Sequence, residues 1–202
     1  MEQLTPTTSR RALLRTLSAA PIAATVVQVR SPWDEALAAL HDHYDDPTAR
    51  LVRTKAGRAL SKIRYHRAEE FFPDRGPRSD SDWHNFLYFA GITAQLGISS
   101  HLLDVGFTDR WCARYIGLRV AKSLAYANAT GFGLYCDRLE RLAAVLTPYS
   151  KWNTPRYIEE PEPDDGNLDP AQVRSLLCTL LDHVHHVTGH PRPKGWRRSA
   201  AL

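Results

Sequence analysis

Cysteine and methionine are scarce in this sequence, which has three cysteines and one methionine in 202 residues. Cys112, Cys136 and Cys178 are far apart and odd in number, and no C-x-x-C motif occurs. This spacing excludes a zinc knuckle and a thioredoxin-type redox site, and it allows at most one disulfide. A chain of this length buries roughly 70% of its unfolded surface, so it can form a core without disulfides or metal. We therefore expect buried free thiols.

The short motifs of the common enzyme classes are also missing. The sequence has no H-E-x-x-H, G-x-S-x-G, P-loop or G-x-G-x-x-G motif, which are the patterns of zinc, serine-hydrolase, phosphate and dinucleotide chemistry. The paired Glu-x-x-His motifs of a di-iron bundle are missing as well. A cysteine nucleophile, Cys136 or Cys178, would need a partner histidine that only the fold can supply. The sequence thus indicates no catalytic residue, and we expect no cofactor.

Long hydrophobic runs are lacking too. The apolar stretch from Thr16 to Val29 is too short and too weakly apolar to cross a membrane. We therefore predict no transmembrane segment.

The residues before this apolar stretch form the most specific motif in the chain. Ser9-Arg10-Arg11-Ala12-Leu13-Leu14-Arg15 resembles the bacterial twin-arginine (Tat) export signal, Ser/Thr-Arg-Arg-x-hydrophobic-Leu-Lys. The resemblance implies that the export machinery recognises Arg10 and Arg11, and that residues 1–30 form a leader cleaved near Ala24. The protein would then be periplasmic. The sequence departs from the family pattern because no clean Ala-x-Ala site follows, so an ordinary N-terminal segment of a cytoplasmic protein is the alternative.

The remainder of the chain, residues 31–190, predicts an all-α fold: a single domain of about six helices packed around a central helical hairpin. The hairpin is the stretch Thr108–Thr147, broken at residues 131–133, Gly-Phe-Gly. Its first helix is apolar on more than one face, which is typical of a helix with neighbours on several sides. Of the remaining helices, the last has the clearest signals, with Asp169 as N-cap, Pro170 in the first turn and Gly189 at the end.

A helix with Ser31 as its N-cap and Pro32 at its first position begins this part of the chain, and two further helices follow it before the hairpin. The first runs from Pro47 to Phe72, and we expect its inward face to hold Val52, Ala56, Ala59, Leu60 and Ile63. The second begins at Ser81 or Asp82 and ends at Gly97, after which a short turn of helix reaches Leu103.

The helix from Pro47 to Phe72 is strongly basic, with seven cationic residues before its first acid. They are Arg50, Arg53, Lys55, Arg58, Lys62, Arg64 and Arg67. Clustered Lys and Arg can bind phosphates through counterion release, so these residues are candidate anion contacts. The alternative is a solvated helix face that pairs with acidic segments such as the proline-rich connector 148–169. A second basic segment, the tail 191–202, ends the chain.

A histidine cluster ends the last helix. Asp182, His186 and His190 follow one another at steps of four, so neighbours can share a helix face. Carboxylate and imidazole at this spacing can bind zinc, nickel or copper if further ligands come from elsewhere. Histidines near a helix C-terminus are also favoured by the helix dipole alone, which is the simpler interpretation.

The sequence therefore leaves three functional hypotheses open. The first is a non-enzymatic helical protein of the bacterial cell envelope that binds or scaffolds a protein partner. The second is a cytoplasmic protein that binds nucleic acid through Arg50–Arg67. The third is a metal-dependent activity at the C-terminal histidines. The layout of leader and helical body resembles small bacterial proteins with no known activity, so the resemblance does not decide between them.

Overall fold

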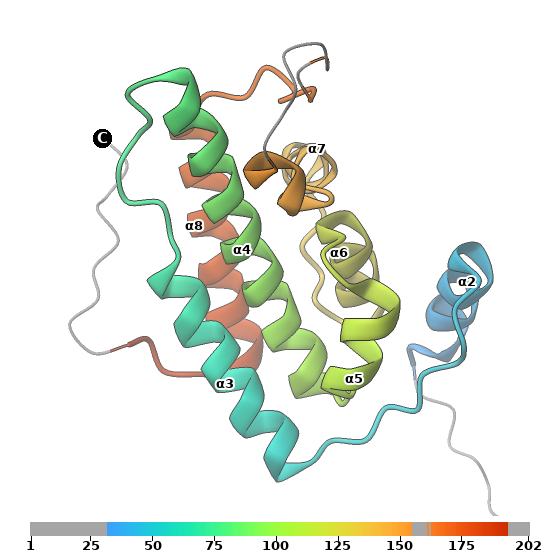
Figure 1. Cartoon of the computed structure of the whole chain (residues 1–202). Coiled ribbons are helices and arrows are strands. Elements are labelled where there is room, and N and C mark those ends of the chain that lie inside the picture. The colour runs from blue at the N-terminus through green and yellow to red at the C-terminus, as the bar shows by residue number, and fades with distance from the viewer. Residues whose placement is uncertain (1–31, 155–160, 162, 194–202) are drawn as a thin grey trace, which may run out of the picture. The chain divides into compact units, whose positions relative to one another are not determined.

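The computed structural model describes residues 32–154, 161 and 163–193, and all regular structure in these residues is helical (Figure 1). The elements are α2 (Asp34–Tyr44), α3 (Lys55–Glu70), α4 (Asp80–Val105), α5 (Asp109–Trp111), the π-helix η1 (Cys112–Ile116), α6 (Val120–Ala129), α7 (Asp137–Val145), the 3-10 helix η2 (Tyr149–Asn153) and α8 (Pro170–Thr188). These elements belong to one compact unit. The prediction of a single all-α domain is confirmed.

Helix α4 is the element around which the others pack. It contacts α3, α6, α8 and η2, and Figure 1 shows it running alongside α3 and α8. Leu87, Ala90 and Leu102 on α4 are completely buried. The hairpin predicted as the centre contains α6 and α7, and it packs beside α4 through α6.

Gly97 lies inside α4, so the helix end predicted there is wrong. A Cβ on residue 97 would lie 3.0 Å from Leu181 Cδ2 and 4.0 Å from Ala68 Cβ. The glycine therefore allows α4 to pack closely against α8 and α3. The helix continues for two more turns and ends at Gly106, which has a left-handed conformation.

By length and composition, Asp82–Val105 in α4 would be able to cross a membrane, but 78% of its apolar window is buried inside the protein. This burial is expected of a core helix. Within the described residues there is accordingly no clear transmembrane segment.

The helix predicted from Thr108 is interrupted between α5 and α6. The N–H of Gly117 donates to the carbonyl of Cys112 at 2.9 Å, which closes a π-turn, and Gly117 then adopts a φ of 61°. The Arg119 guanidinium donates to the carbonyls of Ile116 and Tyr115. These bonds satisfy carbonyl groups that the interruption leaves without a helical partner. The second break, at residues 131–133, is confirmed because α6 ends at Ala129.

Helix α3 begins later than predicted and turns a different face inward. Its N-cap is Thr54, whose hydroxyl accepts from the N–H of Gly57 at 2.9 Å, and residues 46–54 are not helical. The inward face holds Ser61, Tyr65 and Ala68, each fully buried. The residues predicted to face inward are exposed or half-buried: Val52, Ala56, Ala59, Leu60 and Ile63. Tyr65 and Ala68 continue into Phe72, so this side offers more aromatic surface to the core than the predicted one.

Helix α8 follows the sequence prediction closely. The Asp169 carboxylate accepts from the N–H of Gln172 at 2.8 Å, Pro170 occupies the first turn, and Gly189 ends the helix in a left-handed conformation. Val173, Leu177, Leu180, Leu181 and Val184 are completely buried.

Candidate functional site

One flank of α3 borders two hollows. Leu60, Arg64, Arg67 and Phe71 recur at steps of three and four residues and therefore share this flank. An ion pair between Arg64 Nη2 and Asp109 Oδ1, 3.0 Å long, connects α3 to α5. Both hollows include Asp109 in their lining. We refer to them as the Val52 groove and the Arg67 pocket.

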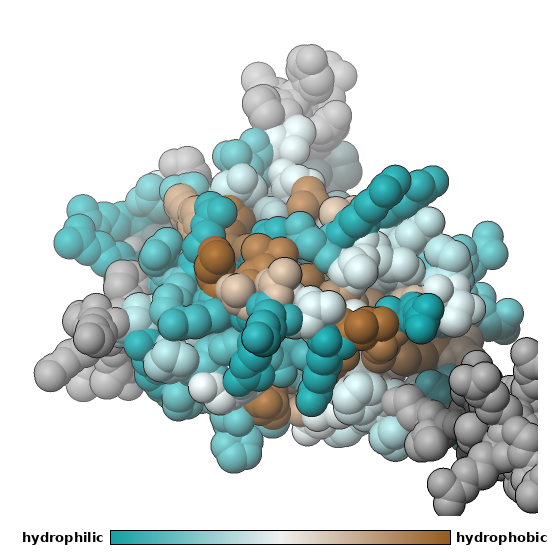
Figure 2. Space-filling model, turned by 90° about the horizontal axis from the view of Figure 1, so that it is seen from below, coloured by the Kyte–Doolittle hydropathy of each residue, from teal (hydrophilic) through white to brown (hydrophobic). Residues whose placement is uncertain are grey.

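The Val52 groove lies at the N-terminal end of α3 and has a volume of about 480 Å³. Its lining is mainly apolar and includes Val52, Ala56, Leu60, Leu103 and Phe107. Val52 is 51% exposed, although its N–H is bonded to the carbonyl of Gly106 at 3.0 Å. Figure 2 looks at the molecule from below and shows apolar side chains gathered among hydrophilic ones. Exposed apolar surface with a polar rim is typical of an interaction site.

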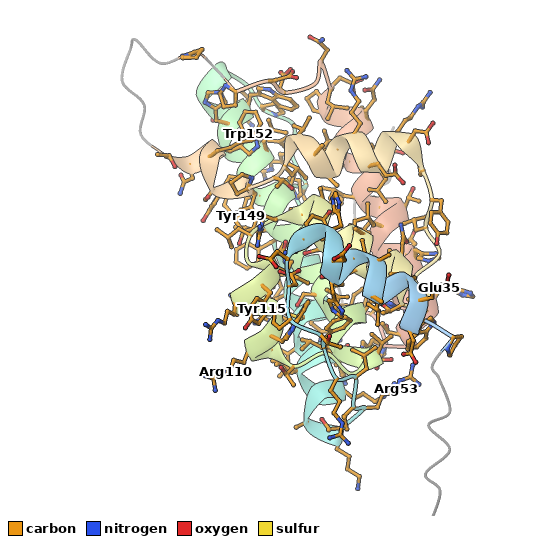
Figure 3. All side chains as sticks on the ribbon, turned by 90° about the vertical axis from the view of Figure 1, so that its right-hand side faces the viewer. Glu35, Arg53, Arg110, Tyr115, Tyr149 and Trp152 are labelled. Carbon is orange, nitrogen blue, oxygen red and sulfur yellow. The ribbon has the colours of Figure 1, made fainter. Side chains whose placement is uncertain are left out.

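The rim of the Val52 groove is basic. Arg50 lines the groove, and Arg53 and Lys55, which are next to lining residues in the chain, are exposed as well. Figure 3 shows Arg53 near the start of α3. None of the three forms an ion pair with any of the described residues. The groove therefore combines apolar surface with cations that are available to a partner.

The other four candidate anion contacts differ in their surroundings. Arg58 donates to Asp104 at 2.8 Å and to the carbonyl of Thr188 at 3.3 Å, and Arg64 pairs with Asp109. Lys62 and Arg67 have no ion pair within the described part of the chain. The seven basic residues thus do not act as one surface, because two of them already hold α3 to neighbouring elements. Whether the other five bind anions stays a prediction.

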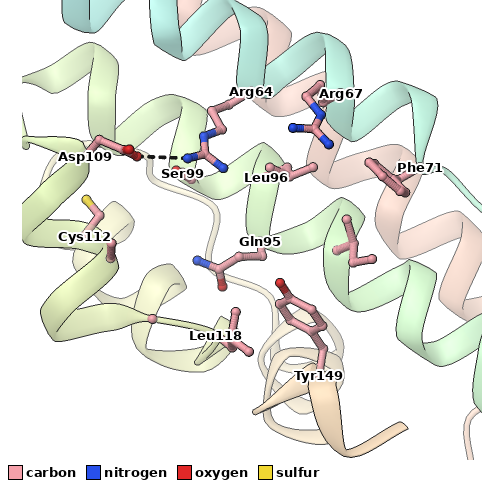
Figure 4. A pocket seen from close by; sticks show the side chains of 13 residues that line it. Arg64, Arg67, Phe71, Gln95, Leu96, Ser99, Asp109, Cys112, Leu118 and Tyr149 are labelled. Atoms are coloured by element: carbon pink, nitrogen blue, oxygen red, sulfur yellow. Dashed lines mark hydrogen bonds and ion pairs between the residues drawn. The ribbon is translucent and has the colours of Figure 1, made fainter. Parts of the chain in front are cut away.

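The Arg67 pocket lies between α3, α4, the π-helix and η2, and its volume is about 400 Å³ (Figure 4). Helix α3 contributes Arg64 and Arg67 to the wall, and Phe71, its C-cap residue, follows them. Further lining residues come from α4, from the π-helix and the residues after it, and from η2: Ile92, Gln95, Leu96, Ser99, Cys112, Ala113, Gly117, Leu118 and Tyr149. This size falls within the usual range of small-molecule sites, about 300–1,000 Å³.

Tyr149 forms one wall of this pocket because α4 has no side chain opposite it. A Cβ on Gly91 would lie 2.1 Å from Tyr149 Cβ, so only glycine lets η2 approach α4 this closely. Tyr149 and Trp152 both come from η2 (Figure 3), and Trp152 is buried. The phenol oxygen of Tyr149 points into the pocket in Figure 4. Burial raises the pKa of this phenol, so its hydroxyl keeps its proton and can donate a hydrogen bond.

The π-helix supplies another wall, with Cys112 and Ala113. Short π-turns inside helices are frequent at functional sites. Cys112 begins this one, and burial, with a smaller contribution from Asp109, raises the pKa of its thiol to about 12. The thiol is therefore protonated near neutral pH and is a poor nucleophile. No sequence pattern predicts the π-turn, although Gly117 marks its end.

The predicted metal residues do not converge. Asp182 pairs with Arg192 at 2.6 Å, His186 is exposed, and His190 is buried against α3. No group of three or more His, Cys, Asp or Glu side chains suited to a metal occurs in the residues that the structure describes. The metal hypothesis stays a prediction, without geometric support from these residues.

His190 instead takes part in a buried polar cluster. Its Nε2 lies 2.6 Å from Ser61 Oγ and 3.9 Å from Asp104 Oδ1. A serine nucleophile would need the acid on the other ring nitrogen and access to substrate. Here the acid approaches the nitrogen that faces the serine, and Ser61 is fully buried while also bonding the carbonyl of Ser100 at 2.6 Å. This cluster therefore joins α3, α4 and the end of α8.

A second buried cluster, around Lys122, also has a structural role. The Lys122 ammonium lies 2.7 Å from Asp46 Oδ2, and both side chains are at most 5% exposed. Tyr126 donates to the same carboxylate at 2.6 Å, and the Lys122 ammonium lies 4.5 Å from the centre of the Tyr44 ring. The cluster attaches α2 and the segment after it to α6. It also engages Asp46 directly before Pro47, where the predicted helix start does not occur.

The predicted signal residues Arg10 and Arg11 lie outside the described residues. In comparisons with known protein families, with curated proteins and with solved structures, nothing matches this chain.

Proposed function

We propose that this chain is a non-enzymatic binding protein and that the Val52 groove, with its basic rim, docks an acidic segment of a partner protein. The observation that carries the proposal is the orientation of α3. Its aromatic side packs inward, so Ala56 in the groove lining remains exposed, as does Ile63 (55%) further along the helix. Val52, in the segment before α3, adds a second exposed apolar side chain (51%) to the groove. An amphipathic segment that lies in an apolar groove is a common mode of peptide recognition.

Charge complementarity identifies the kind of partner. Arg50, Arg53 and Lys55 surround the groove and Lys62 continues along α3, whereas the one acid in the groove lining, Asp109, is paired with Arg64. A segment with an apolar anchor and flanking carboxylates complements this arrangement. Nucleic acid would contact the cations but would not use the apolar floor, which is why a protein partner is the better fit.

The second part of the proposal concerns location. The Ser-Arg-Arg-Ala-Leu-Leu-Arg segment supports a location in the bacterial cell envelope after twin-arginine export. The alternative is that the protein is cytoplasmic and binds nucleic acid. The two parts are independent, because the docking surface would bind an acidic segment in either compartment.

Binding of a labelled acidic peptide tests the docking surface. The probe is a synthetic peptide of about four helical turns with leucines at three- and four-residue steps and glutamates at positions between them. Its control replaces every glutamate with glutamine. Fluorescence anisotropy should show saturable binding of the acidic peptide. Arg50→Glu with Arg53→Glu should weaken it at least tenfold, as should Val52→Asp, whereas Arg138→Glu on the remote helix α7 should not.

Two results would overturn the docking proposal. One is no saturable binding of the acidic peptide at about 50 mM salt, where charge interactions are screened less than at physiological salt. The other is tighter binding of a duplex DNA oligonucleotide than of the peptide, if Arg50→Glu with Arg53→Glu abolishes the DNA binding and Val52→Asp does not. That pattern would favour the nucleic-acid hypothesis.

A further inference from the structure

We infer that the Arg67 pocket is a second, independent binding site, which takes a small amphiphilic carboxylate: one anionic head group on an aliphatic body. The inference goes beyond the proposed docking function and does not depend on it.

The head group would lie against α3. Arg67 projects into the pocket beside Arg64 (Figure 4), its guanidinium lies 5.6 Å from the centre of the Phe71 ring, and it forms no ion pair with the described residues. Arg64 shares its charge with Asp109 at 3.0 Å. The two guanidinium groups and one carboxylate leave a local charge of +1, which one carboxylate would balance. A carboxylate matches the planar guanidinium fork, because its two oxygens can accept two parallel N–H hydrogen bonds.

The body of the ligand would lie against the apolar wall. Phe71, Ile92, Leu96 and Leu118 come from three different parts of the chain and line the same hollow. Leu118 is 42% exposed, so a ligand would cover apolar surface that otherwise faces water. Burying such surface is favourable in proportion to its area.

The polar lining limits the choice of ligand further. Gln95 is already bonded to Ser123 at 2.9 Å, so the neutral donors left in the lining are the hydroxyls of Tyr149 and Ser99. The pocket has neither a glycine-rich loop nor a pair of carboxylates facing it, which are the features that hold the phosphates and Mg²⁺ of a nucleotide. A compact carboxylate with an aliphatic body meets every feature of the wall.

The lining of the pocket also predicts that two substitutions in its wall change the affinity for a carboxylate in opposite directions. Arg67→Gln removes the available cation while keeping a polar, uncharged side chain. Asp109→Asn removes the one carboxylate that repels an anion and frees Arg64 from its partner. If the pocket bound its ligand through apolar contacts alone, neither substitution would change the affinity.

Isothermal titration of the full chain with sodium decanoate near neutral pH tests the inference. Acetate serves as the control for the head group alone, and decylammonium as the control with the same body and opposite charge. We expect one decanoate per chain and no saturable binding of either control. Arg67→Gln should weaken decanoate binding about tenfold or more, since a hydrogen bond to a charged group is lost. Asp109→Asn should strengthen binding severalfold, and Lys62→Gln, an exposed cation on the same helix outside the pocket, should leave it unchanged.

Three outcomes would overturn the inference. They are no saturable decanoate binding to the wild-type chain, equal binding of decylammonium, and equal effects of Arg67→Gln and Lys62→Gln. Peptide docking to the Val52 groove should be unaffected by Arg67→Gln, so failure of this inference is distinguishable from failure of the proposed function. Unchanged circular dichroism and melting temperature would show that each variant is folded.

Discussion

Gly91→Ala offers a direct test of how the Arg67 pocket is built. Two effects of opposite sign compete at this position. Alanine favours a helix by about 1 kcal/mol over glycine, so the substitution would stabilise an exposed position of α4. At residue 91, however, the new Cβ would lie 2.1 Å from Tyr149 Cβ and 2.8 Å from its Cγ.

The steric effect should be larger than the gain in helix propensity. Tyr149 Cβ is attached directly to the backbone, so rotation of the ring cannot relieve the contact. An ordinary contact of 3.4 Å or more requires η2 to move away from α4 by more than an ångström. Overpacking of this kind costs about 1–3 kcal/mol, and the fixed position of the Cβ places this case near the upper end. We therefore expect a net loss of about 2 kcal/mol, or a melting temperature lower by about 4–8 °C for a chain of this size.

Urea unfolding followed by circular dichroism measures this loss, with Gly76→Ala as the matched control because a Cβ on residue 76 has nothing within 4 Å. Tyr149→Gly removes the opposing Cβ, so in that background Gly91→Ala should cost little stability. Tyr149→Ala keeps the Cβ, and the cost of Gly91→Ala should persist there. A Gly91→Ala protein as stable as the wild type would refute the close packing of η2 on α4, and with it the wall of the pocket.

Three further predictions concern the core and the leader. Burial lowers the pKa of His101 from 6.5 to about 4, so between these pH values the unfolded state binds a proton that the folded state does not bind. The free energy of unfolding is therefore highest above pH 6.5 and should fall by roughly 3 kcal/mol towards pH 4. An acid-induced shift of the urea midpoint that is as large in His101→Gln as in the wild type would contradict this. Lys122→Met should destabilise the protein by about 3–5 kcal/mol because the buried carboxylate of Asp46 loses its counter-charge, and adding Asp46→Asn should restore part of the loss in the same assay. Replacing Arg10 and Arg11 with lysine should keep the tagged protein in the cytoplasm, because ammonium does not reproduce guanidinium geometry; wild-type protein found at full length in the cytoplasm by fractionation would end the export hypothesis.

Local signals in the sequence were sufficient to predict an element whose ends and buried face depend on its own residues. Helix α8 is the clearest case, since Asp169, Pro170 and Gly189 act within a few residues of the helix ends and its apolar residues recur on one face. The helical class and the break at residues 131–133 follow from the same kind of local information.

The tertiary structure decided which face of each helix turns inward and which glycine ends a helix. Gly97 and Gly106 look alike in the sequence, yet α4 passes through the first because Leu181 and Ala68 need the space, and ends at the second. Helix α3 has two sides that can be buried, and the choice of Tyr65 and Ala68 over Ala56 and Ile63 depends on the surface that α4 and α8 present. Both candidate sites follow from such choices. The Val52 groove combines residues before and on α3 with residues from the end of α4 to α5, and the Arg67 pocket combines residues from α3, α4, the π-helix and η2. Periodicity within one helix carries no information about its neighbours, and only packing supplies it.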